Sequence, residues 1–150
     1  MEQDWEDGRV TTWGLVMEAT AAVNRRLERE LQREIGIPLT FFEVMLRLAR
    51  TPGDGVALNA LAGQVSFSSG GFSRLVDRME ERGLVERRPC PTNRRSTLVA
   101  LTGDGRRALR RAFQLHAEGL QQLLIDQTSE DELRTLAQAM RRVRDTAAGT

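Results

Sequence analysis

Apolar residues recur at helical spacing along most of the chain. Between Val10 and Ile35 they fall three and four positions apart, and Gly36 follows directly, so the pattern predicts one long amphipathic helix. Shorter runs with the same period predict helices over about 40–50, 58–65, 68–82, 102–127 and 130–143. The apolar seam of the first helix is longer than a small core needs, so it either crosses much of the domain or packs against a partner chain.

Two of these helices begin with the spacing of a capping box. Thr40 is followed three positions later by Glu43, and Ser129 is followed three positions later by Glu132. Each hydroxyl can accept a backbone N–H bond at the helix start, and each carboxylate can return one. The last helix is then expected to bury one apolar face. That face consists of Leu133, Leu136, Ala137, Met140 and Val143.

The middle of the chain combines a short helix, a polar turn and a second helix ended by Gly83, which makes a helix-turn-helix candidate. The second helix has one apolar face and one polar face. Its polar face carries small and cationic residues, including Ser73 and Arg74. The anchoring apolar face consists of Phe72, Leu75, Val76 and Met79.

Two strand-like segments follow, over 84–88 and 96–101. Pro89 and Pro91 lie between them and lack N–H donors, so this connection cannot be a central strand and forms the projecting tip of a β-hairpin. Val56 and Ala57 are compatible with a very short additional strand. A polar helix face beside a basic hairpin suits a DNA groove and its phosphates.

Positive charge is concentrated around this hairpin. All 22 basic residues are Arg, yet the net charge of the chain is only +1. Residues 74–111, by contrast, hold eleven Arg against five Asp and Glu, a net charge of +6. The pairs 87–88 and 94–95 could be a solvated charged surface. Their place after a helix-turn-helix favours DNA contact, because Arg can enter a narrow minor groove.

The composition argues against an enzyme. The chain has one His, one Cys and no Tyr, and it lacks a Gly-rich phosphate loop and metal-ligand spacing, so we expect no catalytic set, metal or cofactor. His116 lies in an apolar stripe, which favours a core or interface residue over a proton sensor. Cys90 lies near several Arg that favour its thiolate, but an incidental loop cysteine is the simpler interpretation.

A cytoplasmic protein of one domain, residues 1–150, is expected. The single Cys excludes an intramolecular disulfide framework, and no apolar run is long enough to span a membrane. The acidic N-terminus lacks the pattern of a signal peptide. We therefore expect no membrane partner.

The chain resembles the MarR family of winged helix-turn-helix transcriptional regulators. The resemblance is carried by residues 72–85, Arg87, residues 93–95, residues 99–102 and Gly105. It implies a mainly α fold with a small β-hairpin wing, in which 37–102 form the winged helix-turn-helix and 1–36 and 103–150 form dimerisation helices. It also implies a homodimer whose two recognition helices lie about one DNA turn apart on a roughly palindromic site.

The resemblance assigns DNA contacts by position, and Arg95 matches the wing arginine that enters the minor groove. Asn93 stands where the family usually has an Asp that orients wing arginines by charge. Asn can hydrogen-bond but is uncharged, so the wing is either more mobile or held by another acid such as Glu86. The implied DNA-binding residues are Ser68, Ser69, Ser73, Arg74, Arg78, Arg94 and Arg95.

Small aromatic or phenolic effectors commonly bind members of this family between the dimerisation helices and the winged helix. The residues expected to line such a pocket are Trp13, Met17, Phe41, Phe42 and Met45, although each also suits a plain core. The family's oxidant sensors carry a cysteine in the first helix. This chain has none there, so oxidant sensing of that kind is disfavoured.

The sequence thus predicts a homodimeric regulator that binds double-stranded DNA sequence-specifically, as a ligand-responsive repressor on a pseudo-palindromic operator. The alternative is a winged-helix module that docks an acidic protein without reading DNA. Replacing Arg94 and Arg95 with Ala separates the two hypotheses, because only a DNA reader would lose DNA affinity and salt dependence.

Overall fold

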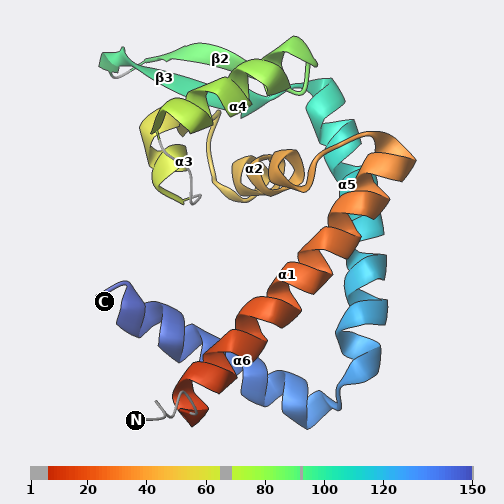
Figure 1. Cartoon of the computed structure of the whole chain (residues 1–150). Helices are drawn as coiled ribbons and strands as arrows, with labels where there is room; N and C mark the ends of the chain where they lie inside the picture. The colour runs from red at the N-terminus through yellow and green to blue at the C-terminus, as the bar shows by residue number, and fades with distance from the viewer. Residues whose placement is uncertain (1–6, 65–68, 92, 150) are drawn as a thin grey trace, which may run out of the picture. The chain divides into compact units, whose positions relative to one another are not determined.

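The computed structural model of the chain describes residues 7–64, 69–91 and 93–149, except the side chains of residues 63, 64, 69, 70, 94 and 95 (Figure 1). Its helices are α1 (Gly8–Ile35), α2 (Leu39–Arg50), α3 (Leu58–Gln64), α4 (Ser69–Glu81), α5 (Gly103–Leu123) and α6 (Glu130–Ala147). Its strands are β1 (Val56–Ala57), β2 (Val85–Cys90) and β3 (Asn93–Leu101), and a short 3-10 helix, η1, covers Ile125–Gln127. The predicted mainly α fold with a small β-hairpin is confirmed.

The chain divides into two compact units. The winged-helix unit comprises Asn24–Leu115, and the terminal unit comprises the segments up to Val23 and from His116 onward. The division falls inside α1 and α5, so each of these helices contributes residues to both units. The sequence placed both helices wholly outside the winged helix. None of the described helices has both the length and the apolar character needed to cross a membrane.

The apolar face of α4 lies in the core of the winged-helix unit. Phe72, Leu75, Val76 and Met79 are each at most 1% exposed, which confirms the predicted anchoring face. Burying each such side chain stabilises the fold by roughly 1.5–3 kcal/mol. Side chains of α1, α2, α3 and α5 complete this core, among them Leu27, Leu31, Phe42, Met45, Leu61, Leu109 and Ala112.

The start of α2 is capped by α1. The capping box predicted at Thr40 is wrong, because α2 begins at Leu39 and its N-cap residue, Pro38, makes no side-chain capping bond. Glu28 on α1 takes that role: its Oε2 accepts the backbone N–H of Leu39 at 2.5 Å. A carboxylate also suits the partial positive charge at a helix start. Local sequence patterns could not predict this capping bond, because Glu28 lies eleven positions before Leu39.

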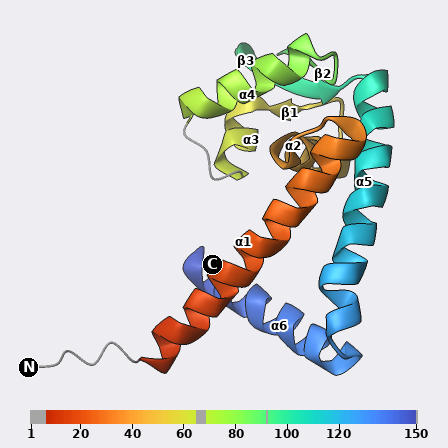
Figure 2. The same cartoon turned by 45° about the vertical axis from the view of Figure 1, so that its right-hand side comes forward.

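The three strands form an antiparallel sheet in the order β1-β3-β2 (Figure 2). The short strand predicted at Val56–Ala57 is confirmed, since Val56 pairs with Val99. The hairpin strands are longer than predicted: β2 continues through Pro89, which pairs with Thr97, and β3 begins at Asn93. A proline is tolerated there because β2 is an edge strand, whose outer side needs no N–H donor.

The turn after α4 sets the direction of β2. Gly83 has φ +67°, a left-handed conformation that glycine adopts without strain. The N–H of Gly83 donates to the carbonyl of Glu80 at 2.8 Å, and the N–H of Leu84 donates to that of Met79 at 3.0 Å. This is the Schellman pattern of hydrogen bonds, which ends a helix sharply.

The start of α5 is joined to the same turn. The Thr102 hydroxyl donates to the carbonyl of Gly83 at 2.5 Å, and it accepts the N–H of Gly105 at 2.9 Å. The N–H of Thr102 donates to the carbonyl of Leu84 at 3.2 Å. One hydrogen-bonded junction therefore joins the end of α4, the base of the hairpin and the start of α5.

The terminal unit leaves its apolar side chains uncovered. The capping box of Ser129 and Glu132 is confirmed, with both reciprocal bonds present. The apolar face of α6 was expected to be buried, but no residue of α6 is buried within this chain. Leu136 and Val143 on that face are 41% and 48% exposed. On α1, Trp13 and Met17 are 55% and 56% exposed. Large apolar side chains of α1 and α6 in this unit are therefore exposed to solvent.

Candidate nucleic-acid interface

The outward face of α4 presents the predicted polar readers. Arg74 and Arg78 are exposed, and Ser73 is half-buried beside them. Ser69 is the first residue of α4, its side chain lying outside the described residues, and Ser68 lies outside them altogether. The opposite face of α4 is fully buried, so the helix is held against the core with Arg74 and Arg78 at the surface.

Arg87 on β2 reaches back across to α4. Its Nη1 donates to Glu80 Oε2 at 2.6 Å and its Nη2 to Asp77 Oδ1 at 2.6 Å. Nη2 also lies 3.4 Å from the carbonyl of Ser73, and the Arg87 N–H donates to Glu80 Oε1 at 2.9 Å. The guanidinium of Arg87 is therefore held by two carboxylates of α4, and its expected DNA contact stays a prediction.

The electrostatics of this pairing agree from both sides. Backbone and side-chain hydrogen bonds from Arg87 lower the pKa of Glu80. Partial burial alone would lower the pKa of Arg87, but the hydrogen bonds to Glu80 and Asp77 outweigh it, and the pKa is raised. Because the guanidinium is only 24% exposed, this pair is less screened than a typical surface ion pair.

The wing strands project beyond α3 and α4 (Figure 1). Arg94 and Arg95 belong to β3, and their side chains lie outside the described residues, so their DNA contacts stay a prediction. Glu86, suggested as a substitute acid for the wing arginines, pairs instead with Arg88 on its own strand. Asn93 pairs with Cys90 across the end of the hairpin.

Residues 35–96 match the model of the MarR family. This match and the relatives described below support a MarR-family winged-helix transcriptional regulator. The multiple antibiotic resistance protein MarR of Escherichia coli K12 is 34% identical over 79 residues, 53% of this chain and 55% of that protein, so the chain spans about half the length of this curated relative. The regulator MhqR of Bacillus subtilis is 28% identical over 125 residues, 83% of each protein.

A solved MarR-family structure has the same fold over most of its length. Sco3205 of Streptomyces coelicolor, crystallised in complex with DNA, has a TM-score of 0.85 and 27% identity, over 97% of this chain and 91% of that one. MarR-family proteins are transcriptional regulators and not enzymes. Among the described residues, no three His, Cys, Asp or Glu side chains are grouped to hold a metal.

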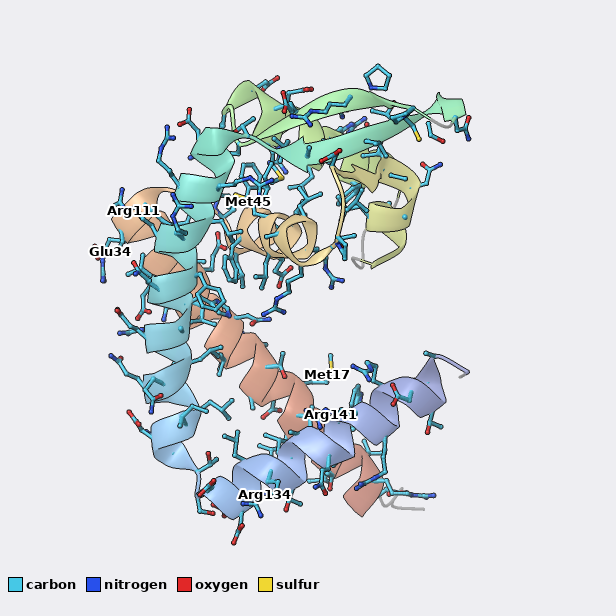
Figure 3. All side chains as sticks on the ribbon, turned by 180° about the vertical axis from the view of Figure 1, so that it is seen from behind. Met17, Glu34, Met45, Arg111, Arg134 and Arg141 are labelled. Atoms are coloured by element: carbon cyan, nitrogen blue, oxygen red, sulfur yellow. The ribbon has the colours of Figure 1, made fainter. Side chains whose placement is uncertain are left out.

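The proposed effector residues fall into two groups. Phe41, Phe42 and Met45 on α2 are at most 3% exposed and belong to the core of the winged-helix unit. Trp13 and Met17 belong to the terminal unit, and Figure 3 labels Met17 on α1 and Met45 on α2 in these separate units. An effector site made by all five residues stays a prediction.

A different groove lies between α2 and α5 of the winged-helix unit. It has a volume of about 320 Å³. Phe113 in its wall is 48% exposed. The lining residues are Leu46, Leu109, Arg110, Phe113 and Gln114. Sequence reasoning missed the groove because it needs the spatial pairing of two helices about sixty residues apart.

Two residues considered for sensing lie outside the outward face of α4. His116 belongs to the terminal unit, and burial lowers its pKa, which favours the neutral imidazole. Cys90 is half-buried at the end of β2. Neither position adds a group to the outward face of α4.

The two compact units carry opposite charge. The winged-helix unit contains 17 Arg against 10 Asp and Glu, a net charge of +7. The terminal unit contains 5 Arg against 11 Asp and Glu, a net charge of −6. The modest net charge of the protein therefore results from cancellation between the units, and the positive potential belongs to the unit that carries α4 and the wing.

Proposed function

We propose that this protein binds double-stranded DNA sequence-specifically and regulates transcription, as a homodimer and most simply as a repressor that covers its promoter. The observation that carries the proposal is the outward face of α4, anchored by four buried side chains and presenting Ser73, Arg74 and Arg78 from a unit of charge +7. Side chains on such a face reach base edges and phosphates in the major groove.

The homodimer is supported by the uncovered apolar faces of the terminal unit. The α1 residues Trp13 and Met17 and the α6 residues Leu136 and Val143 are each at least 41% exposed. Large exposed apolar surfaces in a folded protein usually mark an interface. A second copy of the chain presents the same faces, and a two-fold dimer would bring two recognition helices to a pseudo-palindromic operator.

A small aromatic effector is supported by the groove between α2 and α5. Its apolar wall suits an aromatic ring, and the guanidinium of Arg110 at its rim suits a carboxylate or phenolate. An effector with different affinities for the DNA-binding conformation and a non-binding conformation would shift the equilibrium between the two. Replacing Phe113 with Ala should then abolish the effect of an aromatic acid on DNA affinity while leaving DNA binding without the effector unchanged.

DNA binding is tested by fluorescence anisotropy with fragments from the upstream region of the protein's own gene. We expect specific binding at least about a thousandfold tighter than binding to random DNA. Replacing Arg74 or Arg78 with Ala should weaken binding. If the arginine contacts a phosphate, the log–log salt slope should also fall by about 0.9. A protein with no sequence-selective, salt-sensitive affinity for any genomic fragment would contradict the proposal.

The alternative, a winged-helix module that docks an acidic protein, makes an opposite prediction for the wing. Replacing Arg94 and Arg95 with Ala should reduce affinity and salt slope for a DNA reader. The module would have no DNA affinity to lose.

A further inference from the structure

The C-terminal turn of α4 is bound to the connection between α1 and α2. Arg82 Nη2 donates a hydrogen bond to the carbonyl oxygen of Gly36 at 2.9 Å. The guanidinium carbon of Arg82 lies 5.5 Å from the centroid of the Phe41 ring. Arg78, one turn earlier, has its guanidinium carbon 5.9 Å from the same centroid. One ring of α2 therefore faces Arg78 of α4 and Arg82, which directly follows α4.

The Phe41 ring is a fixed platform for these charges. It is 3% exposed, so it is held by the core while its face remains available to both guanidinium groups. Two like charges four positions apart on a helix repel each other. The negative potential of an aromatic face attracts each of them, and a planar guanidinium can also stack on the ring, which a lysine ammonium cannot do in the same way.

Gly36 provides the second fixed point. It has φ +64° and ends α1, and its N–H donates to the carbonyl of Gln32 at 3.0 Å. Its own carbonyl oxygen therefore has a defined position, and Arg82 binds it from a residue 46 positions later in the chain. Because α1 contributes residues to both compact units, this bond connects the recognition helix directly to a helix shared by the two.

We infer that Arg82 is a positioning residue for DNA recognition: its bond to Gly36 and its stacking on Phe41 fix the orientation of α4, and with it the direction in which Arg78 is presented. Arg82 need not touch DNA itself. The inference rests on the proposed DNA-binding function and adds a residue to which no DNA contact was assigned.

Replacing Arg82 with Lys tests the inference, because Lys keeps the positive charge and loses the planar, directed fork. If Arg82 positions α4, Arg82→Lys and Arg82→Gln should both lower operator affinity, by roughly threefold to thirtyfold, the range of couplings measured for residues outside a binding site. The salt slope of Arg82→Lys should equal that of the wild type, since no phosphate contact is lost. Affinity and slope come from anisotropy titrations at several salt concentrations, and circular dichroism checks the fold.

Arg74→Lys is the matched control. Arg74 is exposed on the same helix and, among the described residues, has no contact with Phe41 or Gly36, so its Lys variant reports what an Arg-to-Lys change costs at a proposed DNA-contacting position. Phe41→Leu provides an independent test in a double-mutant cycle. The double variant with Arg82→Lys should lose less binding free energy than the sum of the losses in the two single variants, because both changes remove the same contact between the guanidinium and the ring.

Operator affinity equal to that of the wild type in Arg82→Lys would overturn the inference. A reduced salt slope in Arg82→Gln would also overturn it, and would make Arg82 a plain phosphate contact. A wild-type protein that binds no DNA would overturn the proposed function as well. The two failures are therefore distinguishable in one set of titrations.

Discussion

At the residue scale, Gly105 shows how tightly α5 is joined to the recognition helix. A Cβ at this position would overlap the carbonyl oxygen of Leu84 and lie 2.9 Å from its carbonyl carbon. Leu84 cannot easily withdraw, because its N–H is bound to Met79 and its carbonyl accepts the N–H of Thr102. The glycine is needed here for close approach of two backbones.

Replacing Gly105 with Ala should lower the free energy of unfolding by about 1–3 kcal/mol, the usual cost of overpacking. Gly103 is the matched control, because the nearest neighbour of its added Cβ is Arg107 Nη1 at 3.8 Å. Urea denaturation at one fixed protein concentration measures both variants. Equal stabilities of the two alanine variants would show that Leu84 yields without cost.

A pH dependence follows from Glu80. Hydrogen bonds from the backbone and side chain of Arg87 lower its pKa in the folded protein. A carboxylate with a lowered folded-state pKa stabilises fully above its ordinary value of 4.5, and this contribution is lost as pH falls through the folded-state pKa. The stability difference between wild type and Glu80→Gln should therefore be constant from about pH 7 to 5 and shrink below about pH 4.5.

Chemical denaturation across this pH range measures that difference. Glu81→Gln is the control, since Glu81 is exposed on the same helix and, in the described part of the chain, has no hydrogen bond or ion pair with Arg87. If the stability difference between the wild type and Glu80→Gln does not change down to pH 3, Glu80 does not contribute to the acid sensitivity of the fold.

At the element scale, Arg87 makes the wing and the recognition helix one reading device. It links β2 to Asp77 and Glu80 on α4, so the direction of the hairpin depends on the helix that is proposed to enter the DNA groove. Arg88, the next residue, pairs with Glu86 on its own strand, and no ion pair joins it to another element within the described residues. Two adjacent arginines of equal charge therefore have different structural roles.

Replacing Arg87 with Met should weaken operator binding by about tenfold or more, because loss of one partner leaves two carboxylates unpaired beside the DNA-facing surface. Arg88→Met removes the same charge without breaking a link between elements, so it should cost clearly less. Anisotropy titrations compare the two variants. Equal losses would mean that Arg87 acts through its charge alone.

Local patterns were enough to predict the helices, the buried face of α4 and the short strand at Val56. They failed where the deciding partner is distant in sequence, as with Glu28 at the start of α2. They also did not reveal the ion pairs of Arg87, because charge patterning locates a cation without showing which carboxylates of another element lie beside it. The extension of β2 through Pro89 was missed because a strand's edge position is a property of the sheet and not of its sequence.

At the scale of the whole molecule, charge and apolar surface are divided between the two units. The winged-helix unit has a charge of +7 and the terminal unit −6. The terminal unit also carries most of the large exposed apolar side chains, such as Trp13, Met17 and Leu136. Positive potential is thus concentrated where DNA is proposed to bind, and apolar surface where a second subunit is proposed to pack.

Replacing both Leu136 and Val143 with Asp should convert a dimer to a monomer, because charges would be buried unpaired in the proposed interface. Multi-angle light scattering after size exclusion measures the mass. Operator affinity should fall by at least about tenfold with the loss of the second recognition helix. Gln138→Asp, an exposed change on the same helix, should remain dimeric. A wild-type protein that is already monomeric would contradict this arrangement.

The order β1-β3-β2 has a consequence for solubility. A sheet edge offers unpaired backbone groups to which another chain can add a strand. Here one edge strand has only two residues, and the other carries Glu86, Arg87, Arg88 and Pro89. Short length, charge and proline are each known to block strand addition. The wing can therefore project from the protein without strand addition between neighbouring copies, even where the local protein concentration is high.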